Sequence, residues 1–261
     1  MLTVLQKYFI SVILSLITSI ALGVTLLFSA SSFAEPLRIA VASNFTSPIQ
    51  KLAPLFEQET GVKVALSFGS SGKFFAQIQH GAPFDVFLSA DQAKPNKLIK
   101  KGLALKENQI IYAKGVLALW SATSKSMKPI EEALSSARKI AIANPKLAPY
   151  GKAAEETLKS LTLWSSVQSK LVQGENIGQT YQFTYTKNAD IGFVALSQVL
   201  SGDIKGHFWK VPSIYHSDIK QSAVILKRSS QQKEAASFLA FLMRSDIQKK
   251  IEKFGYQTST Q

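Results

Sequence analysis

The stretch VKVALSFGSSGKFFAQIQHGAPFDVFLSAD, residues 62–91, decides the fold class. Two apolar runs in it predict strands over Val62–Phe68 and Asp85–Ser89. Between them the pattern predicts a helix over Gly72–His80, because apolar residues recur at helical spacing and Gly81 can end the helix. A strand, a helix and a strand in succession indicate two parallel strands covered by a helix.

The same alternation runs from Leu37 to the C-terminal end and predicts an α/β protein with mostly parallel sheets. The other predicted strands are Leu37–Ala42, Gln109–Trp120, Ile140–Ala143, Ile191–Ala195 and Ser222–Lys227, with Ser166–Leu171 either a strand or a helix end. The other predicted helices are Thr46–Thr60, with a kink at Pro54, Gln92–Lys101, Gly151–Ser160, Ile177–Thr186, Gln231–Met243 and Asp246–Phe254. The layout suggests two lobes joined by crossings near residues 112–116 and 221–226, although a single doubly wound domain gives a similar pattern.

The first 34 residues are typical of a signal peptide. Lys7 precedes an apolar run over Phe9–Phe28, and small residues at Ser32 and Ala34 favour cleavage after Ala34. The cleaved protein would be periplasmic. The run is also long enough to span a bilayer, so an uncleaved anchor is the alternative.

The net charge of +13 does not indicate a nucleic-acid partner. Only four of the 30 basic residues are arginines, the side chain that base and phosphate recognition favours, and the lysines are dispersed. The chain has no cysteine, which excludes disulfides and thiolate metal sites.

Polar residues occupy four predicted turns between a strand and a helix. These turns are Ala42–Asn44, Gly69–Gly72, Asn144–Gly151 and Gly174–Gly178. Such turns gather at the carboxyl edge of a parallel sheet, and each helix start offers free N–H groups that favour an anion. A single serine or asparagine there is more often only a helix cap. Four such turns in two series together predict an anion site.

As whole strings, these turns resemble the periplasmic molybdate-binding family of ABC importers. The most specific match is Gly81-Ala82-Pro83-Phe84-Asp85-Val86-Phe87-Leu88-Ser89-Ala90-Asp91, preceded by Ser67–Gly72. The strings Ala42–Phe45, Ala143–Gly151 and Phe254–Tyr256 are also similar, so the match covers nearly all of residues 37–256.

The resemblance implies a type II periplasmic binding protein fold, whose two α/β lobes close on one oxyanion. Lobe I would comprise residues 35–113 and 224–261, and lobe II residues 114–223. The ligand would be molybdate or tungstate, held without any direct metal-ion ligand or cofactor. The resemblance further implies a monomer that delivers this anion to a membrane permease and catalyses nothing.

The resemblance implies that five residues bind the ligand. Ser43 and Asn44 would hold the anion from the first turn, and Ser71 would supply its hydroxyl and N–H. Tyr150, through its hydroxyl, and the backbone of Ile177 would complete the site from lobe II. One branch of the family has a tyrosine where this chain has Ala195. The other branch, which uses Asn44 and Tyr150, is closer, and Ala195 then fits as a small wall residue.

Three alternatives remain. Sulfate or phosphate could be the anion, because similar turns bind both. A serine hydrolase is disfavoured, since Gly69–Gly72 lacks the spacing of a nucleophile elbow, and His80 is better explained as a helix end. A regulator's effector domain would need a DNA-binding helix pair. Asp85 and Asp91 match the family string, but a carboxylate beside a dianion is repulsive, so structural roles are expected for both.

Overall fold

The computed structural model describes residues 8–9, 35–123, 126, 129–204 and 206–258. The predicted signal peptide and its cleavage after Ala34 lie outside these ranges, apart from Tyr8 and Phe9. None of the helices in the described ranges is both long and apolar enough to cross a membrane.

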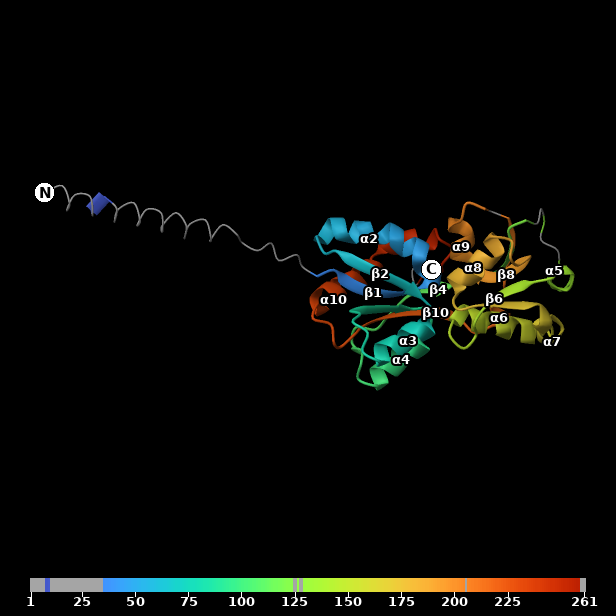
Figure 1. The fold of residues 1–261 in the computed structure, drawn as a ribbon, viewed down its shortest axis with the longest axis horizontal. Helices are drawn as coiled ribbons and strands as arrows, with labels where there is room; N and C mark the ends of the chain where they lie inside the picture. Colours follow the sequence, from blue (N-terminus) through green and yellow to red (C-terminus); the bar gives the residue numbers. More distant parts are fainter. Residues whose placement is uncertain (1–7, 10–34, 124–125, 127–128, 205, 259–261) are drawn as a thin grey trace. The chain divides into compact units, whose positions relative to one another are not determined.

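Two five-stranded mixed sheets form the framework (Figure 1). The first sheet has the order β2-β1-β3-β10-β4, where β1 is Leu37–Ala42, β2 Val64–Gly69, β3 Val86–Ser89, β4 Ile110–Gly115 and β10 Ile219–Ile225. Strands β1, β2 and β3 are parallel, and β10 is antiparallel to both of its neighbours. We call this sheet and its helices lobe I.

Alternate residues of β1 face opposite sides of the first sheet, and helices cover both sides. Ile39 and Val41 belong to the core under α2 (Thr46–Thr60), α10 (Gln232–Met243) and α11 (Ser245–Glu252). Ala40 belongs to the core under α3 (Ser71–Gln79) and α4 (Ala93–Lys100). Helix α2 has the predicted bounds and continues through Pro54.

The second sheet has the order β7-β6-β8-β5-β9, and with its helices we call it lobe II. Its strands are β5 Leu117–Ser121, β6 Ile140–Ala143, β7 Leu171–Gly174, β8 Ile191–Ala195 and β9 His207–Lys210. Its helices are α5 Ile130–Ser136, α6 Pro149–Ser160, α7 Trp164–Val167, α8 Ile177–Tyr185 and α9 Leu196–Ser201. As in lobe I, three neighbouring strands, β7, β6 and β8, pair in parallel, and one strand, β5, is antiparallel to both of its neighbours.

The prediction of one strand over Gln109–Trp120 is wrong. Strand β4 ends at Gly115 and β5 begins at Leu117, and the two strands belong to different sheets. An apolar run shows that a segment is buried but not in which sheet, so the break was not visible in the pattern. Of the two alternatives for Ser166–Leu171, the structure shows the helix end: the segment ends α7 and continues as a short 3-10 turn, and β7 begins only at Leu171.

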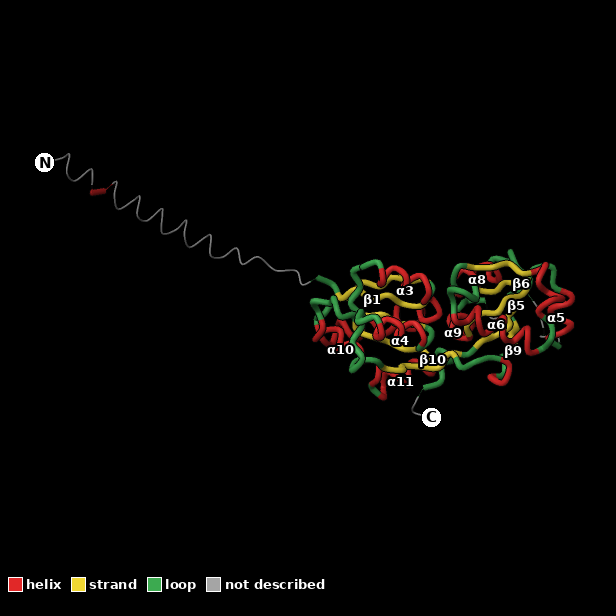
Figure 2. The backbone as a smooth tube through the Cα atoms, turned by 90° about the horizontal axis from the view of Figure 1, so that it is seen from below, coloured by secondary structure: helices red, strands yellow, loops and turns green. Residues whose placement is uncertain are grey.

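The chain passes between the lobes along the paired strands β4 and β10, and Figure 2 shows β10 at this crossing. Val116 links β4 to β5, and the return path from β9 enters β10 at Ile219. The two-lobed fold is therefore confirmed, whereas the predicted bounds 35–113, 114–223 and 224–261 stay a prediction.

Candidate functional site

The polar turns of the two lobes meet at the carboxyl ends of their parallel strands. Residues Ser43–Phe45 form a 3-10 turn directly after β1, and α3 follows β2. From lobe II, α6 follows β6 and α8 follows β7. Hydrogen bonds then join these turns across the interface between the lobes.

Ser43 and the start of α8 form the first of these contacts. The Ser43 hydroxyl donates to Asn176 Oδ1 over 3.1 Å, and the same oxygen caps α8 by accepting from Gln179 N–H. A Cβ placed on Gly178 would lie 3.3 Å from Ser43 Cβ. Helix geometry leaves the N–H groups of Ile177 and Gly178 without intrahelical acceptors. The structure therefore brings Ser43 and Ile177 together.

Ser71 begins α3 and is almost completely buried. Its Oγ accepts from Ala90 N–H over 2.9 Å, so its own proton is left to donate elsewhere. The next residue, Gly72, bonds to lobe II: its N–H donates to Leu147 O over 2.8 Å. Beside it, Lys73 Nζ lies 2.8 Å from Glu175 Oε1, an ion pair between the lobes.

Asn44 and Tyr150 are connected through Gln221 of β10. Asn44 Nδ2 donates to Gln221 Oε1 over 2.8 Å and to Tyr256 Oη over 2.9 Å. Gln221 Nε2 donates to Tyr150 Oη over 3.3 Å. The side chains of Asn44 and Tyr150 therefore belong to one buried polar network at the strands that join the lobes.

Two further hydroxyls donate hydrogen bonds to the backbone carbonyl of Asn44. Tyr256 Oη and Ser197 Oγ both donate to Asn44 O, over 2.7 and 2.9 Å. Sequence reasoning missed Gln221 and Ser197, gave Asn176 no role beyond its place in a predicted polar turn, and gave Tyr256 none beyond its place in a family-like string. Their partners are more than a hundred residues away along the chain, so no local pattern signals them.

The network is electrically neutral. Burial raises the pKa of Tyr112 and Tyr150 well above the ordinary value and raises that of Tyr256 to about 12. All three hydroxyls therefore keep their protons at physiological pH and remain donors. Neutral donors suit an ionised oxyanion, because several oriented dipoles replace its water without a fixed counter-charge.

The wall around these donors is apolar. Ala42, Ala90, Ala148, Tyr150, Ile177 and Ala195 belong to one buried cluster that includes residues of both lobes. Ala195 is completely buried in it, in agreement with a small wall residue.

Asp85 and Asp91 have structural contacts. Asp85 is buried and accepts from Arg38 N–H and the Ser229 hydroxyl, away from the residues above. Asp91 accepts from Lys94 N–H in the first turn of α4 and pairs with the Lys94 ammonium. Both contacts agree with the structural roles expected for these carboxylates.

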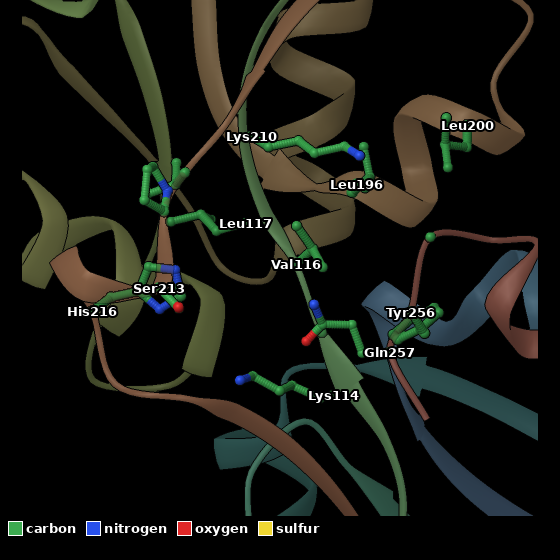
Figure 3. A pocket seen from close by; sticks show the side chains of 14 residues that line it. Lys114, Val116, Leu117, Leu196, Leu200, Lys210, Ser213, His216, Tyr256 and Gln257 are labelled. Carbon is green, nitrogen blue, oxygen red and sulfur yellow. The ribbon is translucent and has the colours of Figure 1, made fainter. Parts of the chain in front are cut away.

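Three cavities of about 360–400 Å³ border this region. One includes Asn176, another Ala90 and Ala148, and a third Tyr256. Figure 3 shows the third, in which Tyr256 and Gln257 lie beside Lys114 and Val116 at the strands between the lobes. The five predicted ligand residues do not line these three cavities and lie instead in the buried interface between the lobes.

The contacts of Ser71 and His80 do not resemble those of the nucleophile and base of a serine hydrolase. The Ser71 hydroxyl is bonded to a backbone N–H, and His80 is the C-terminal cap of α3. In the described ranges, no group of three or more His, Asp or Glu side chains is arranged to hold a metal ion.

Comparisons with known proteins agree with this architecture. A family model described as "Bacterial extracellular solute-binding protein" matches residues 37–257. The molybdate-binding protein of Rhodobacter capsulatus is 43% identical over 220 residues, 84% of this chain and 87% of that protein. The molybdate-binding protein of Azotobacter vinelandii is 43% identical over 241 residues, 91% of this chain and 95% of that protein.

Solved structures give the same result. The periplasmic molybdate-binding protein of Azotobacter vinelandii matches with a TM-score of 0.81 at 37% identity, over 84% of this chain and 98% of that chain. The sulfate-binding protein of Mycobacterium tuberculosis matches with a TM-score of 0.73 at 12% identity, which shows the shared fold alone. The chain thus belongs to the molybdate-binding proteins within the bacterial extracellular solute-binding family.

Proposed function

We propose that this protein captures a tetrahedral oxyanion, molybdate or tungstate, between its lobes and delivers it to an ABC importer. The main observation is that three helix starts, those of α3, α6 and α8, meet the turn after β1 in a buried interface. Ser43 and Ser71 lie there beside the N–H groups of first helical turns. The relatives that bind molybdate support the choice of anion.

In the proposed complex, Ser71 donates its free proton to the anion while its oxygen still accepts from Ala90. Ser43 turns its hydroxyl from Asn176 toward the ligand. Backbone N–H groups at Asn44, Tyr150 and Ile177 complete the shell, which places partial positive charge of three helix ends on one dianion.

The side chains of Tyr150 and Asn44 also make hydrogen bonds within the protein. The hydroxyl of Tyr150 accepts from Gln221, and both amide protons of Asn44 are donated to Gln221 and Tyr256. In this arrangement the backbone N–H groups of Asn44 and Tyr150 are their proposed donors to the anion, and the Tyr150 hydroxyl, which only accepts from Gln221, keeps its own proton to donate.

Calorimetric titration of the chain from Glu35 onward tests this proposal with molybdate, tungstate, sulfate, phosphate and chromate. Molybdate and tungstate are expected to bind most tightly and to raise the unfolding temperature as their concentration increases. Binding of none of the five would disprove the oxyanion function, and sulfate or phosphate binding as tight as molybdate would disprove the narrower choice.

Two serine variants test the site itself. Ser71→Ala removes a proposed anion donor and is expected to weaken molybdate binding roughly 10- to 150-fold, since a hydrogen bond to a charged group contributes about 1.5–3 kcal/mol. Ser121→Ala is the matched control, because Ser121 is also buried but donates to Asp190 O inside lobe II. Equal affinities of the two variants would exclude Ser71 from the site.

We also propose that the protein is a periplasmic monomer that acts in transport and not in catalysis, with residues 1–34 removed after Ala34. Mass spectrometry of the exported protein measures the cleavage point, and light scattering measures the number of subunits. A mass that retains the first 34 residues would indicate a membrane anchor instead.

A further inference from the structure

Gln221 connects the polar side chains of the site through hydrogen bonds. It is completely buried in β10, at a shift in the register between β10 and β4. Its Oε1 accepts from Asn44 Nδ2 over 2.8 Å and from Tyr112 over 3.2 Å, and its Nε2 donates to Tyr150 over 3.3 Å. One amide thus joins the turn after β1, both strands between the lobes and the first turn of α6.

The hydrogen-bond directions in this network leave one buried atom unsatisfied. Asn44 Oδ1 is inaccessible to solvent and has no hydrogen-bond partner among the described residues. Both protons on Asn44 Nδ2 are already donated to Gln221 and Tyr256. In this arrangement the unpaired atom of the Asn44 side chain is a hydrogen-bond acceptor. An oxyanion is also an acceptor, so it cannot bond to this atom.

A second arrangement gives Asn44 Oδ1 hydrogen-bond donors. An amide keeps its shape when a half-turn exchanges its oxygen and nitrogen. With both amides turned, Gln221 Nε2 donates to Asn44 Oδ1 and to Tyr112, and Tyr150 donates to Gln221 Oε1. Tyr112 can then donate to Ser89 O, which lies 3.5 Å away.

This second arrangement changes what Asn44 presents. Tyr256 can donate to the turned Oδ1, and Ser197 still donates to Asn44 O. Asn44 Nδ2 now occupies the position without a partner, and its N–H groups are free. The unsatisfied acceptor becomes a free donor, the group that an anion requires.

We propose that Gln221 is a positioning residue of the oxyanion site and that anion binding reverses the amides of Asn44 and Gln221 together. This inference rests on the proposed function. Gln221 touches no ligand in it. Its amide can accept from Asn44 Nδ2 in one arrangement and donate to Asn44 Oδ1 in the other. Asn44 therefore turns an N–H toward the anion only when Gln221 turns as well.

Two variants of Gln221 separate this role from a general effect on folding. Gln221→Met keeps the length of the side chain but cannot hold Asn44 in either arrangement. We expect molybdate affinity at least ten-fold below that of the unsubstituted protein, in the range of one lost charge-assisted hydrogen bond. Gln248→Met is the control, because Gln248 is equally buried and bonds to Tyr112 O and Leu242 O without touching Asn44.

Gln221→Glu adds a pH readout that a purely structural role would not give. A protonated Glu donates to Asn44 Oδ1 and accepts from Tyr150, so it supports the reversed arrangement. The ionised Glu only accepts, and therefore holds Asn44 with its oxygen toward the anion. The titratable groups that face this position are Tyr112, Tyr150 and Tyr256, and burial raises the pKa of each.

The expected profile follows from this difference. Affinity of Gln221→Glu should be close to that of the unsubstituted protein at low pH. It should fall about ten-fold per pH unit above the pKa of the introduced carboxyl, relative to the unsubstituted protein measured in parallel. Each variant is first shown to be folded by its cooperative thermal unfolding without ligand.

Unchanged affinity of Gln221→Met would overturn the proposal, even if Gln221→Glu lost affinity at high pH, since charge repulsion alone would then explain the loss. An equal loss in Gln248→Met would also overturn it. If Gln221→Met does not fold, a flat profile of Gln221→Glu refutes the proposal and the falling profile supports it. If the unsubstituted protein bound no oxyanion, the proposed function itself would be wrong.

Discussion

A methyl group added at Gly72 is expected to separate anion binding from stability. Gly72 lies in the first turn of α3, and its N–H donates to Leu147 O in lobe II. A Cβ at this position would lie 2.8 Å from Leu147 O and 2.9 Å from Leu147 Cα. Both are backbone atoms of the opposite lobe, so a rotation of a side chain cannot relieve the overlap.

Gly72→Ala therefore acts on the closed arrangement of the lobes. Overpacking of this kind costs about 1–3 kcal/mol, so anion affinity should fall roughly 5- to 150-fold. Within lobe I, the same change replaces glycine by alanine in a helix, which stabilises by about 0.5–1 kcal/mol. Affinity and ligand-free stability should therefore change in opposite directions.

Calorimetry with molybdate and denaturant unfolding without ligand measure the two effects. Gly69→Ala is the control, because a Cβ there meets only the ring of Phe74 in the same lobe, at 3.1 Å. Its affinity should stay close to that of the unsubstituted protein. Unchanged affinity of Gly72→Ala would refute the argument, since it would mean that binding does not require the contact between α3 and Leu147.

Three further outcomes are expected. Tyr150→Phe leaves the Gln221 amide without its acceptor and should weaken molybdate binding about ten-fold in calorimetry, as for a lost buried hydrogen bond; unchanged affinity would separate Tyr150 from the site. Lys73→Met breaks the half-exposed pair with Glu175 and should reduce affinity by only a few-fold at low salt and less at high salt, as measured by titration at two ionic strengths. A backbone N–H donated to its carboxylate lowers the pKa of Glu57, so its stabilisation is present above the unfolded pKa and is lost as pH falls through the folded pKa; unfolding of Glu57→Gln should therefore depend less on pH at and below about pH 4.5, the ordinary range of glutamate.

Much of the fold was predictable from local sequence. The bounds of β1, α2 and β8 agree with their patterns because each has a strong apolar period and a clear end, such as Gly61 in the left-handed conformation after α2. Helix α9 and strand β9 were not predicted. Both are short, and their burial comes from packing against distant segments, so neither has a period long enough to detect.

The candidate site, too, was predictable only in part. The turns at Ser43, Ser71 and Ile177 were predictable, because helix starts after parallel strands must lie at one edge of a sheet. The side-chain directions of Asn44 and Tyr150 were not. They depend on Gln221, whose position between them is set by the pairing of β10 with β4 and by the contact between the lobes.

In the proposed complex, binding and closure would be coupled, because the same residues take part in both. Ser43 bonds to Asn176 across the interface, Gly72 to Leu147, and Ser197 to the backbone of Asn44. An anion that orients Ser43 and Asn44 therefore changes the groups that hold the lobes together. A ligand shifts such an equilibrium only by its difference in affinity between the two forms. Ser43, Asn44 and Ser71 belong to lobe I and would reach the anion in an open form as well, so the part of the binding free energy that favours closure is the part that Tyr150 and Ile177 of lobe II would add.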